Sequence, residues 1–129
     1  MKYSNAEIET MIHSARELGG CRGLLGHVLA YNIRRLTEAA QEYLSAKDDM
    51  LVKYGTEQVD QQGNPTGWYV IDKEAHPDVV DELATLGAVE HDVDVSKIKY
   101  MEAIETKAGE SLLDLTCEQQ LSIAWMLED

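Results

Sequence analysis

The 129-residue chain has no phenylalanine and only two prolines and two cysteines. Without phenylalanine the core must consist of Leu, Ile, Val, Met and Ala, a composition that favours packed helices over a large sheet sandwich. Cys21 and Cys117 match neither a disulfide-rich secreted protein nor a zinc motif, so we expect a reduced, cytoplasmic setting. Long apolar runs are also missing, and a span needs roughly 18 consecutive apolar residues. We therefore predict no contact with a membrane.

Basic residues are scarce, and this scarcity limits the partners. Eleven Lys and Arg stand against 24 Asp and Glu, which gives a net charge of −13. A surface with this charge repels phosphate backbones, so direct binding of nucleic acid is disfavoured. The length is that of one ordinary globular domain, which predicts a single domain over residues 1–129.

No motif of catalytic or cofactor chemistry stands out. The sequence has no nucleophile elbow, zinc-protease motif or phosphate-binding glycine loop. His13, Cys21 and His27 are close in sequence, but their spacing fits no common zinc site. We therefore predict that the protein is not an enzyme, with no catalytic, cofactor-binding or metal residues.

Helical periodicity dominates the first 54 residues. Ser4 and Glu7 form a capping-box pattern ahead of a helix over 5–18, whose apolar residues recur at helical spacing. A longer stripe without proline predicts a helix over 24–54, about 45 Å long. These helices should form an antiparallel hairpin, and the uncovered length of the long arm predicts a homo-oligomer, most simply a two-fold dimer.

Three segments of the remaining chain have the character of strands. Segments 57–60 and 68–71 flank a turn cluster around Gly63, which predicts a β-hairpin. From 89 to 95, valines and His91 alternate with acidic residues, the period expected of a strand with one apolar face. We expect the three segments to form one small antiparallel sheet.

Two short helices complete the expected fold. Asp72 can cap a helix that ends at Gly87, and Thr116 with Gln119 forms a second capping-box pattern near the C-terminus. The fold class is therefore α+β, with an N-terminal helical hairpin that includes one long helix, a small antiparallel sheet of about three strands and a short C-terminal helix.

Two tryptophans offer candidate binding anchors. Trp68 lies beside the turn of the expected hairpin, and Trp125 lies near the C-terminus. In a chain without phenylalanine, large apolar side chains are needed inside, so we expect both tryptophans to fill the core.

The acidic residues are distributed unevenly along the chain. Residues 1–71 carry nine acidic and seven basic residues, whereas residues 72–129 carry fifteen and four. A surface of this kind can meet a basic partner, imitate a phosphate backbone or simply be solvated, and solvation is the commoner case. The candidate acidic interaction surface consists of Asp78, Asp81, Glu82, Glu90, Asp92 and Asp94.

The order of these parts resembles small proteins encoded by phages and prophages of Gram-positive bacteria. The similar features are the long helix that ends in Lys53-Tyr54-Gly55, the turn with Asp60 and Gly63, and the C-terminal Met126-Leu127-Glu128-Asp129. The resemblance implies an accessory protein of a mobile element that acts inside a bacterium, and it assigns no functional residue.

Two functions are compatible with these observations. The first is a non-enzymatic module that self-associates and docks on another phage or host protein, and it follows from the long helix and the missing chemistry. The second is an acidic inhibitor whose C-terminal half occupies a nucleic-acid site on a host enzyme, with carboxylates in place of phosphates. A basic host or phage protein is the expected partner in that case.

Overall fold

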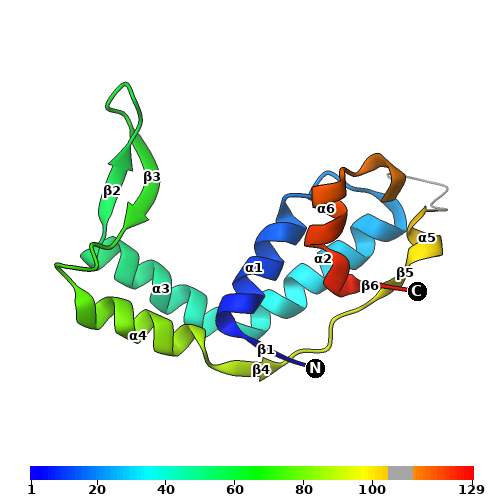
Figure 1. The fold of residues 1–129 in the computed structure, drawn as a ribbon, viewed down its shortest axis with the longest axis horizontal. Coiled ribbons are helices and arrows are strands. Elements are labelled where there is room, and N and C mark those ends of the chain that lie inside the picture. The colour runs from blue at the N-terminus through cyan, green and yellow to red at the C-terminus, as the bar shows by residue number, and fades with distance from the viewer. Residues whose placement is uncertain (105–111) are drawn as a thin grey trace. The chain divides into compact units, whose positions relative to one another are not determined.

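The computed structural model describes residues 1–104 and 112–129 (Figure 1). The backbone forms two compact units: unit 1 combines residues 1–40 with 90–129, and unit 2 comprises residues 41–89. The sequence Ala108-Gly109-Glu110 also predicts a break in regular structure, and these three residues lie outside the described ones. The single domain expected over residues 1–129 from the chain length stays a prediction.

Unit 1 is mainly helical. Its elements are β1 (Lys2–Ser4), α1 (Asn5–Arg16), α2 (Gly23–Ala39), β4 (Glu90–Asp92), β5 (Ile98–Lys99), α5 (Tyr100–Ile104), the 3₁₀ turn η1 (Leu112–Asp114), α6 (Cys117–Ser122), the 3₁₀ turn η2 (Ala124–Met126) and β6 (Leu127–Glu128). Unit 2 consists of α3 (Gln41–Tyr54), β2 (Thr56–Val59), β3 (Pro65–Val70) and α4 (Pro77–Gly87).

Both predicted capping boxes are present in unit 1. At α1, the Ser4 hydroxyl accepts the Glu7 backbone N–H at 3.1 Å, and the Glu7 carboxylate accepts the Ser4 N–H at 3.1 Å. At α6, Thr116 and Gln119 exchange the same pair of bonds at 3.1 and 2.9 Å. Each box satisfies two helix-terminal donors, so the start of each helix is determined by adjacent sequence.

The helix predicted over 24–54 is divided in two. At Ala40 the backbone leaves helical geometry, with φ −104° and ψ 12°, so that α2 ends and α3 begins. No proline or glycine lies at this position, and the two helices have different neighbours: α2 packs against α1, whereas α3 packs against α4. The helical hairpin of α1 and α2 is confirmed, but the uncovered arm on which the dimer argument depended is absent.

The core of unit 1 forms where α1 and α2 meet segments from the C-terminal part of the chain. The helix predicted over 5–18 ends at Arg16, and its buried apolar stripe of Ile8, Met11, Ile12 and Ala15 is followed by the buried Leu18 in the turn. It continues into a cluster of Leu25, Val28, Leu29, Ile98, Ala103, Leu112, Ile123 and Met126. This core is aliphatic, as the composition predicts, and Trp125 packs against it half-buried.

Unit 1 contains two short strand pairs, of which only β1 with β4 joins its two sequence halves. β1 pairs antiparallel with β4, and β5 pairs parallel with β6. Residues 89–95 therefore do not join the hairpin in one sheet as expected; only 90–92 are a strand, and their partner is the N-terminal segment. A three-residue strand such as Lys2–Ser4 is too short to be detected from periodicity.

One buried polar side chain ties α2 to the segment after β4. Asn32 is fully buried; its amide nitrogen donates to the Ser96 carbonyl at 2.8 Å, and its amide oxygen accepts the Ser96 N–H at 2.7 Å. The two bonds satisfy both backbone groups of Ser96, which lies in a stretch without regular structure.

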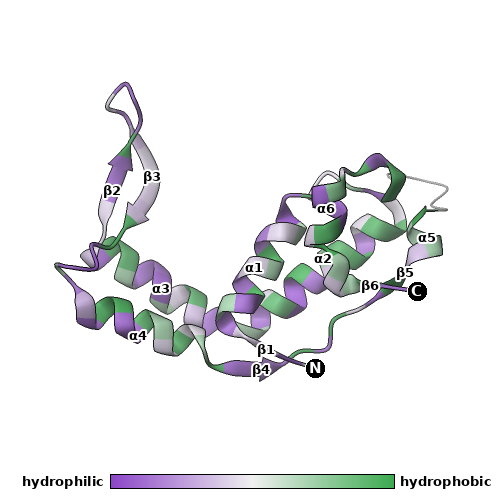
Figure 2. Cartoon of the chain, in the orientation of Figure 1, coloured by the Kyte–Doolittle hydropathy of each residue, from purple (hydrophilic) through white to green (hydrophobic). Residues whose placement is uncertain are grey.

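Unit 2 contains a pair of helices and the predicted β-hairpin. α4 begins at Pro77 rather than after Asp72, since proline suits the first helical turn and Asp72 instead forms a tight turn through its bond to the Glu74 N–H at 2.9 Å. Figure 2 shows both hydrophobic and hydrophilic residues along α3 and α4. Their apolar side chains are half-buried at best, apart from the buried Tyr43.

The described elements establish an α+β fold with small sheets and a short C-terminal helix. Among the described helices, none combines the length and apolar character that a membrane crossing requires.

Candidate functional site

The six candidate acidic residues are all exposed, and they fall into both units. Asp78, Asp81 and Glu82 lie on α4 in unit 2. Glu90 and Asp92 lie on β4, and Asp94 follows it, in unit 1. Each unit thus carries three of the six candidates, and each triplet is described within its own unit.

In the α4 triplet, one carboxylate is placed favourably. Asp78 lies in the first turn, directly after Pro77, where the helix dipole stabilises negative charge. Asp81 and Glu82 lie further along the helix and lack that benefit. They lie three and four residues after Asp78, so each is a like-charged neighbour of Asp78 on the helix surface and is repelled by it.

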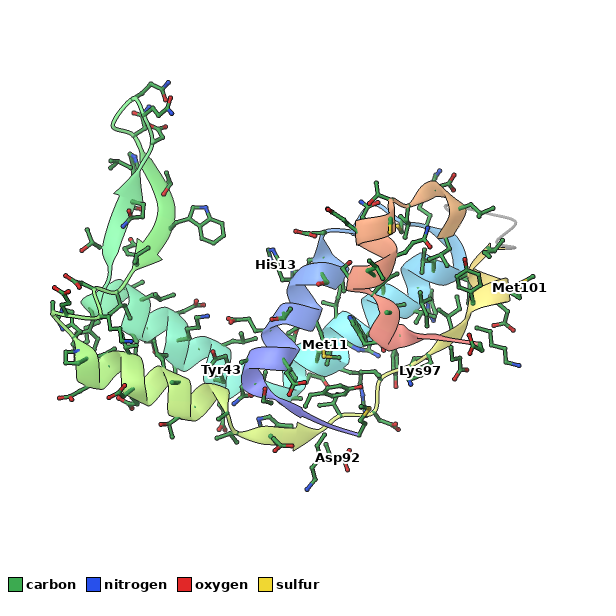
Figure 3. The ribbon with its side chains drawn as sticks, viewed as in Figure 1. Met11, His13, Tyr43, Asp92, Lys97 and Met101 are labelled. Atoms are coloured by element: carbon green, nitrogen blue, oxygen red, sulfur yellow. The ribbon has the colours of Figure 1, made fainter. Side chains whose placement is uncertain are left out.

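In the β4 triplet, Asp92 has a specific partner. Its carboxylate lies 3.1 Å from the N-terminal ammonium, in line with the pairing of Lys2 and Asp92 across β1 and β4 (Figure 3). The carboxylate is 74% exposed, so this ion pair contributes little stability. His91 is half-buried and pairs with the buried Tyr3, which confirms the predicted alternation of faces in β4.

The described residues give little support to metal or thiol chemistry. Within 1–104 and 112–129, no three His, Cys, Asp or Glu side chains are placed to hold a metal ion. His13 instead approaches Glu17 on the next turn of α1 at 3.4 Å. Cys21 is half-buried and Cys117 is exposed, and they do not form a disulfide.

The β2–β3 hairpin presents an exposed apolar surface, where the prediction for Trp68 is wrong. Trp68 is 71% exposed and Val70 is 55% exposed. Residues two apart in a strand share a face, and Thr56 pairs with Val70, so these three residues form one face without a charged side chain. We call Thr56, Trp68 and Val70 the hairpin face. Sequence could not reveal its exposure, because a tryptophan after a turn suits a core equally well.

The hairpin is ordered by local hydrogen bonds. In the turn, the Asp60 carboxylate accepts the Gln62 and Asn64 N–H groups, both at 2.9 Å, and Gly63 adopts a φ of +82° that favours glycine. The Thr66 hydroxyl donates to the Gln58 carbonyl at 2.8 Å where the register shifts. The exposed tryptophan is therefore presented on a structured hairpin.

Figure 1 shows β2 and β3 extending as a two-stranded ribbon beyond the end of α3. Apart from the half-buried Tyr69, all residues of both strands are exposed. Both strands are also edges, with a free row of backbone donors and acceptors. The face that carries Trp68 and Val70 is therefore uncovered, whereas the face that carries Tyr69 is partly covered.

Protein-family models, curated proteins and solved structures contain no match to this chain. Its function must therefore be inferred from its own exposed surfaces.

Proposed function

We propose that this chain is a non-enzymatic interaction module that self-associates through the hairpin face of unit 2. The observation that carries the proposal is the exposure of Trp68 and Val70 on one uncharged face of a two-stranded ribbon. Isolated two-stranded hairpins are marginal in water, and an exposed tryptophan is the side chain most enriched at the centre of interfaces.

The charge of the chain favours a second copy as the occupant of this face. Two copies with a net charge of −13 repel each other, so they can associate only where local charge is low. Residues 61–71 carry no acidic or basic residue, the longest uncharged stretch of unit 2. Two hairpin faces packed across a two-fold axis bury tryptophan and valine without bringing carboxylates into contact.

The cellular setting is part of the same proposal. The two thiols support a reducing compartment, and the resemblance to phage and prophage proteins supports the bacterial cytoplasm. A basic host or phage protein is a further partner in this setting, through the acidic triplets.

Light scattering after size exclusion tests self-association. We expect the wild-type protein to show about twice its 14.4 kDa mass at high concentration. The double variant Trp68→Ser, Val70→Ser should elute at the single-chain mass. Leu121→Ser is the matched control, because Leu121 is 69% exposed but lies in unit 1 on α6.

Two results would contradict the proposal: a single-chain mass for the wild type at high concentration, or an undiminished oligomer in the double variant. Circular dichroism of both variants establishes that they are folded. Since all substituted side chains are exposed, we expect spectra equal to that of the wild type.

A further inference from the structure

The solvent-facing side of α2 differs in charge from the rest of the chain. Residues 1–40 contain five basic and four acidic residues, whereas residues 41–129 contain six and twenty. On α2, the exposed residues include His27, Arg34, Arg35 and Glu38. The adjacent arginines, on an otherwise acidic protein, point to a partner of opposite charge.

His27 and Arg34 border an open surface cavity of about 310 Å³, whereas Arg35 lies outside its lining. The described residues that line it are His27, Ala30, Tyr31 and Arg34, which follow the i, i+3, i+4, i+7 spacing of one helix face. Leu24, 44% exposed, lies one turn before His27 on the same face. The surface thus combines apolar, aromatic and cationic side chains along about 16 Å of helix.

Two arginines share one aromatic ring at this cavity. The guanidinium carbons of Arg34 and Arg35 lie 5.7 and 6.0 Å from the centroid of Tyr31, within the range of cation–π attraction. This attraction holds both guanidinium groups near the ring and reduces the ordering that a ligand must impose. Within the described residues, no carboxylate lies close enough to either group to form an ion pair.

The chemistry of such a pair is recognition of an anion. A guanidinium presents parallel N–H donors that match a carboxylate bidentately, with charge-assisted bonds about twice as strong as neutral ones. Tyrosine and arginine are also the residue types most enriched among those that dominate binding energy. The cavity beside them can accept an apolar side chain.

We propose that this face of α2 binds an acidic amphipathic peptide segment of a partner protein. An apolar side chain of the segment occupies the cavity beside Ala30 and Tyr31, and its carboxylates pair with Arg34 and Arg35. The site is separate from the hairpin face, and the proposal is independent of self-association.

Other occupants fit the face less well. A nucleic acid needs a run of cations along its backbone, and a chain with a net charge of −13 repels it. An enclosed small molecule needs a site that buries most of its surface, whereas Tyr31 and Arg34 are themselves exposed. The acidic α4 of a second copy offers Asp81 and Glu82, but its apolar Val80 and Leu83 are already half-buried in unit 2.

Fluorescence anisotropy with a designed probe tests the proposal. The probe is a fluorescein-labelled peptide of about twelve residues in which glutamates flank a leucine, and its partner probe has glutamine in place of every glutamate. We expect the glutamate probe to bind the wild-type protein, and Arg34→Ala with Arg35→Ala to weaken binding at least about tenfold. Tyr31→Ala should also weaken it, whereas Tyr31→Phe retains the ring and the affinity.

Arg16→Ala is the matched control, since it removes one exposed arginine from α1. We expect less than about a twofold change from it, because a remote exposed charge is largely screened. Trp68→Ser, Val70→Ser should bind the glutamate probe as the wild type does, which separates this site from self-association.

Four results would overturn the proposal. They are no binding of the glutamate probe, equal binding of the glutamine probe, equal losses from Arg16→Ala and the arginine pair, and competition by inorganic phosphate as effective as that by the unlabelled peptide. A single-stranded oligonucleotide that binds through Arg34 and Arg35 more tightly than the peptide would instead assign the face to phosphate backbones.

Discussion

Unit 1 and unit 2 differ most in how much apolar surface they bury. Unit 1 has an extensive aliphatic core, whereas Tyr43 is the single buried hydrophobic residue of unit 2. The apolar side chains of α4, such as Leu83, reach only partial burial. Because burial of apolar area is the main driving force of folding, we infer that unit 1 supplies most of the stability.

The two units differ also in charge density. Unit 1 has fourteen acidic and eight basic residues over its 80 positions, and unit 2 has ten and three over 49. Unit 2 thus concentrates like charge where hydrophobic burial is weakest. We therefore expect unit 2 to gain more stability than unit 1 from salt, which screens its like charges, and from a second copy, which covers exposed apolar surface.

The largest expected effect is a cavity in the core of unit 1. Leu29 is 3% exposed within the core cluster, so Leu29→Ala should cost about 2–5 kcal/mol of unfolding free energy. Leu83→Ala removes the same atoms from a half-buried site in unit 2 and should cost about 1 kcal/mol. Urea unfolding followed by circular dichroism measures both.

Equal losses of unfolding free energy in Leu29→Ala and Leu83→Ala would show that the stability of both units depends on apolar burial to the same degree. A single transition with one slope in both variants would establish the cooperative unfolding of one domain. Two transitions, of which only the earlier shifts in Leu83→Ala, would mean that unit 2 unfolds separately.

A second effect concerns the two hydrogen bonds between Asn32 and Ser96 in unit 1. Asn32→Ala leaves the Ser96 N–H and carbonyl without their buried partner, at a cost of about 2–3 kcal/mol. Asn32→Leu restores the volume but not the hydrogen bonds, so it should be nearly as destabilising. If Asn32→Leu recovers wild-type stability in urea, packing rather than hydrogen bonding explains the role of Asn32.

A third, smaller effect comes from a helix cap in unit 1. Thr116→Ala removes the side-chain acceptor of the Gln119 N–H and should cost about 1 kcal/mol. Thr116→Ser keeps the hydroxyl and should retain most of the stability. In unit 2, the N-cap residue of α4 is His76, whose side chain makes no capping hydrogen bond. Substitution of His76 should therefore cause no comparable loss of stability. A urea midpoint unchanged by Thr116→Ala would contradict this assignment.

The features that sequence predicted well are those determined by neighbouring residues. The capping boxes at Ser4 and Thr116, the apolar stripe of α1 and the β-hairpin all depend on short-range spacing, and the structure confirms them. Each is satisfied within a few residues, so no knowledge of the tertiary fold is needed.

The features that sequence reasoning missed depend on distant segments. Ala40 is a good helix former, yet α2 ends there, and α2 and α3 pack against different helices that are distant in sequence. β4 pairs with a strand of three residues near the N-terminus. Trp68 is exposed because no other segment packs over its side of the hairpin, and local sequence does not reveal this. The pairing of two arginines with Tyr31 follows from helical spacing, but the cavity beside them does not.

The smallest expected effect comes from neutralising carboxylates in the two acidic triplets. Asp81→Asn with Glu82→Gln removes repulsion from α4 but leaves Asp78 at its favourable helix position. The matched variant in unit 1, Glu90→Gln with Asp94→Asn, leaves the ion pair of Asp92 intact. Thermal unfolding at low and high ionic strength compares the two.

Since unit 2 has the higher charge density, the α4 variant should raise Tm at low salt by about 1–3 °C, and the β4 variant by less. Both gains should disappear near 0.5 M salt, where the screening length is about 4 Å. A basic partner relieves the same repulsion, so it should bind each variant more weakly than the wild type, in proportion to the Tm gain. If neither variant responds to salt and both retain the same partner, the carboxylates are only a solvated surface, and the acidic inhibitor hypothesis fails.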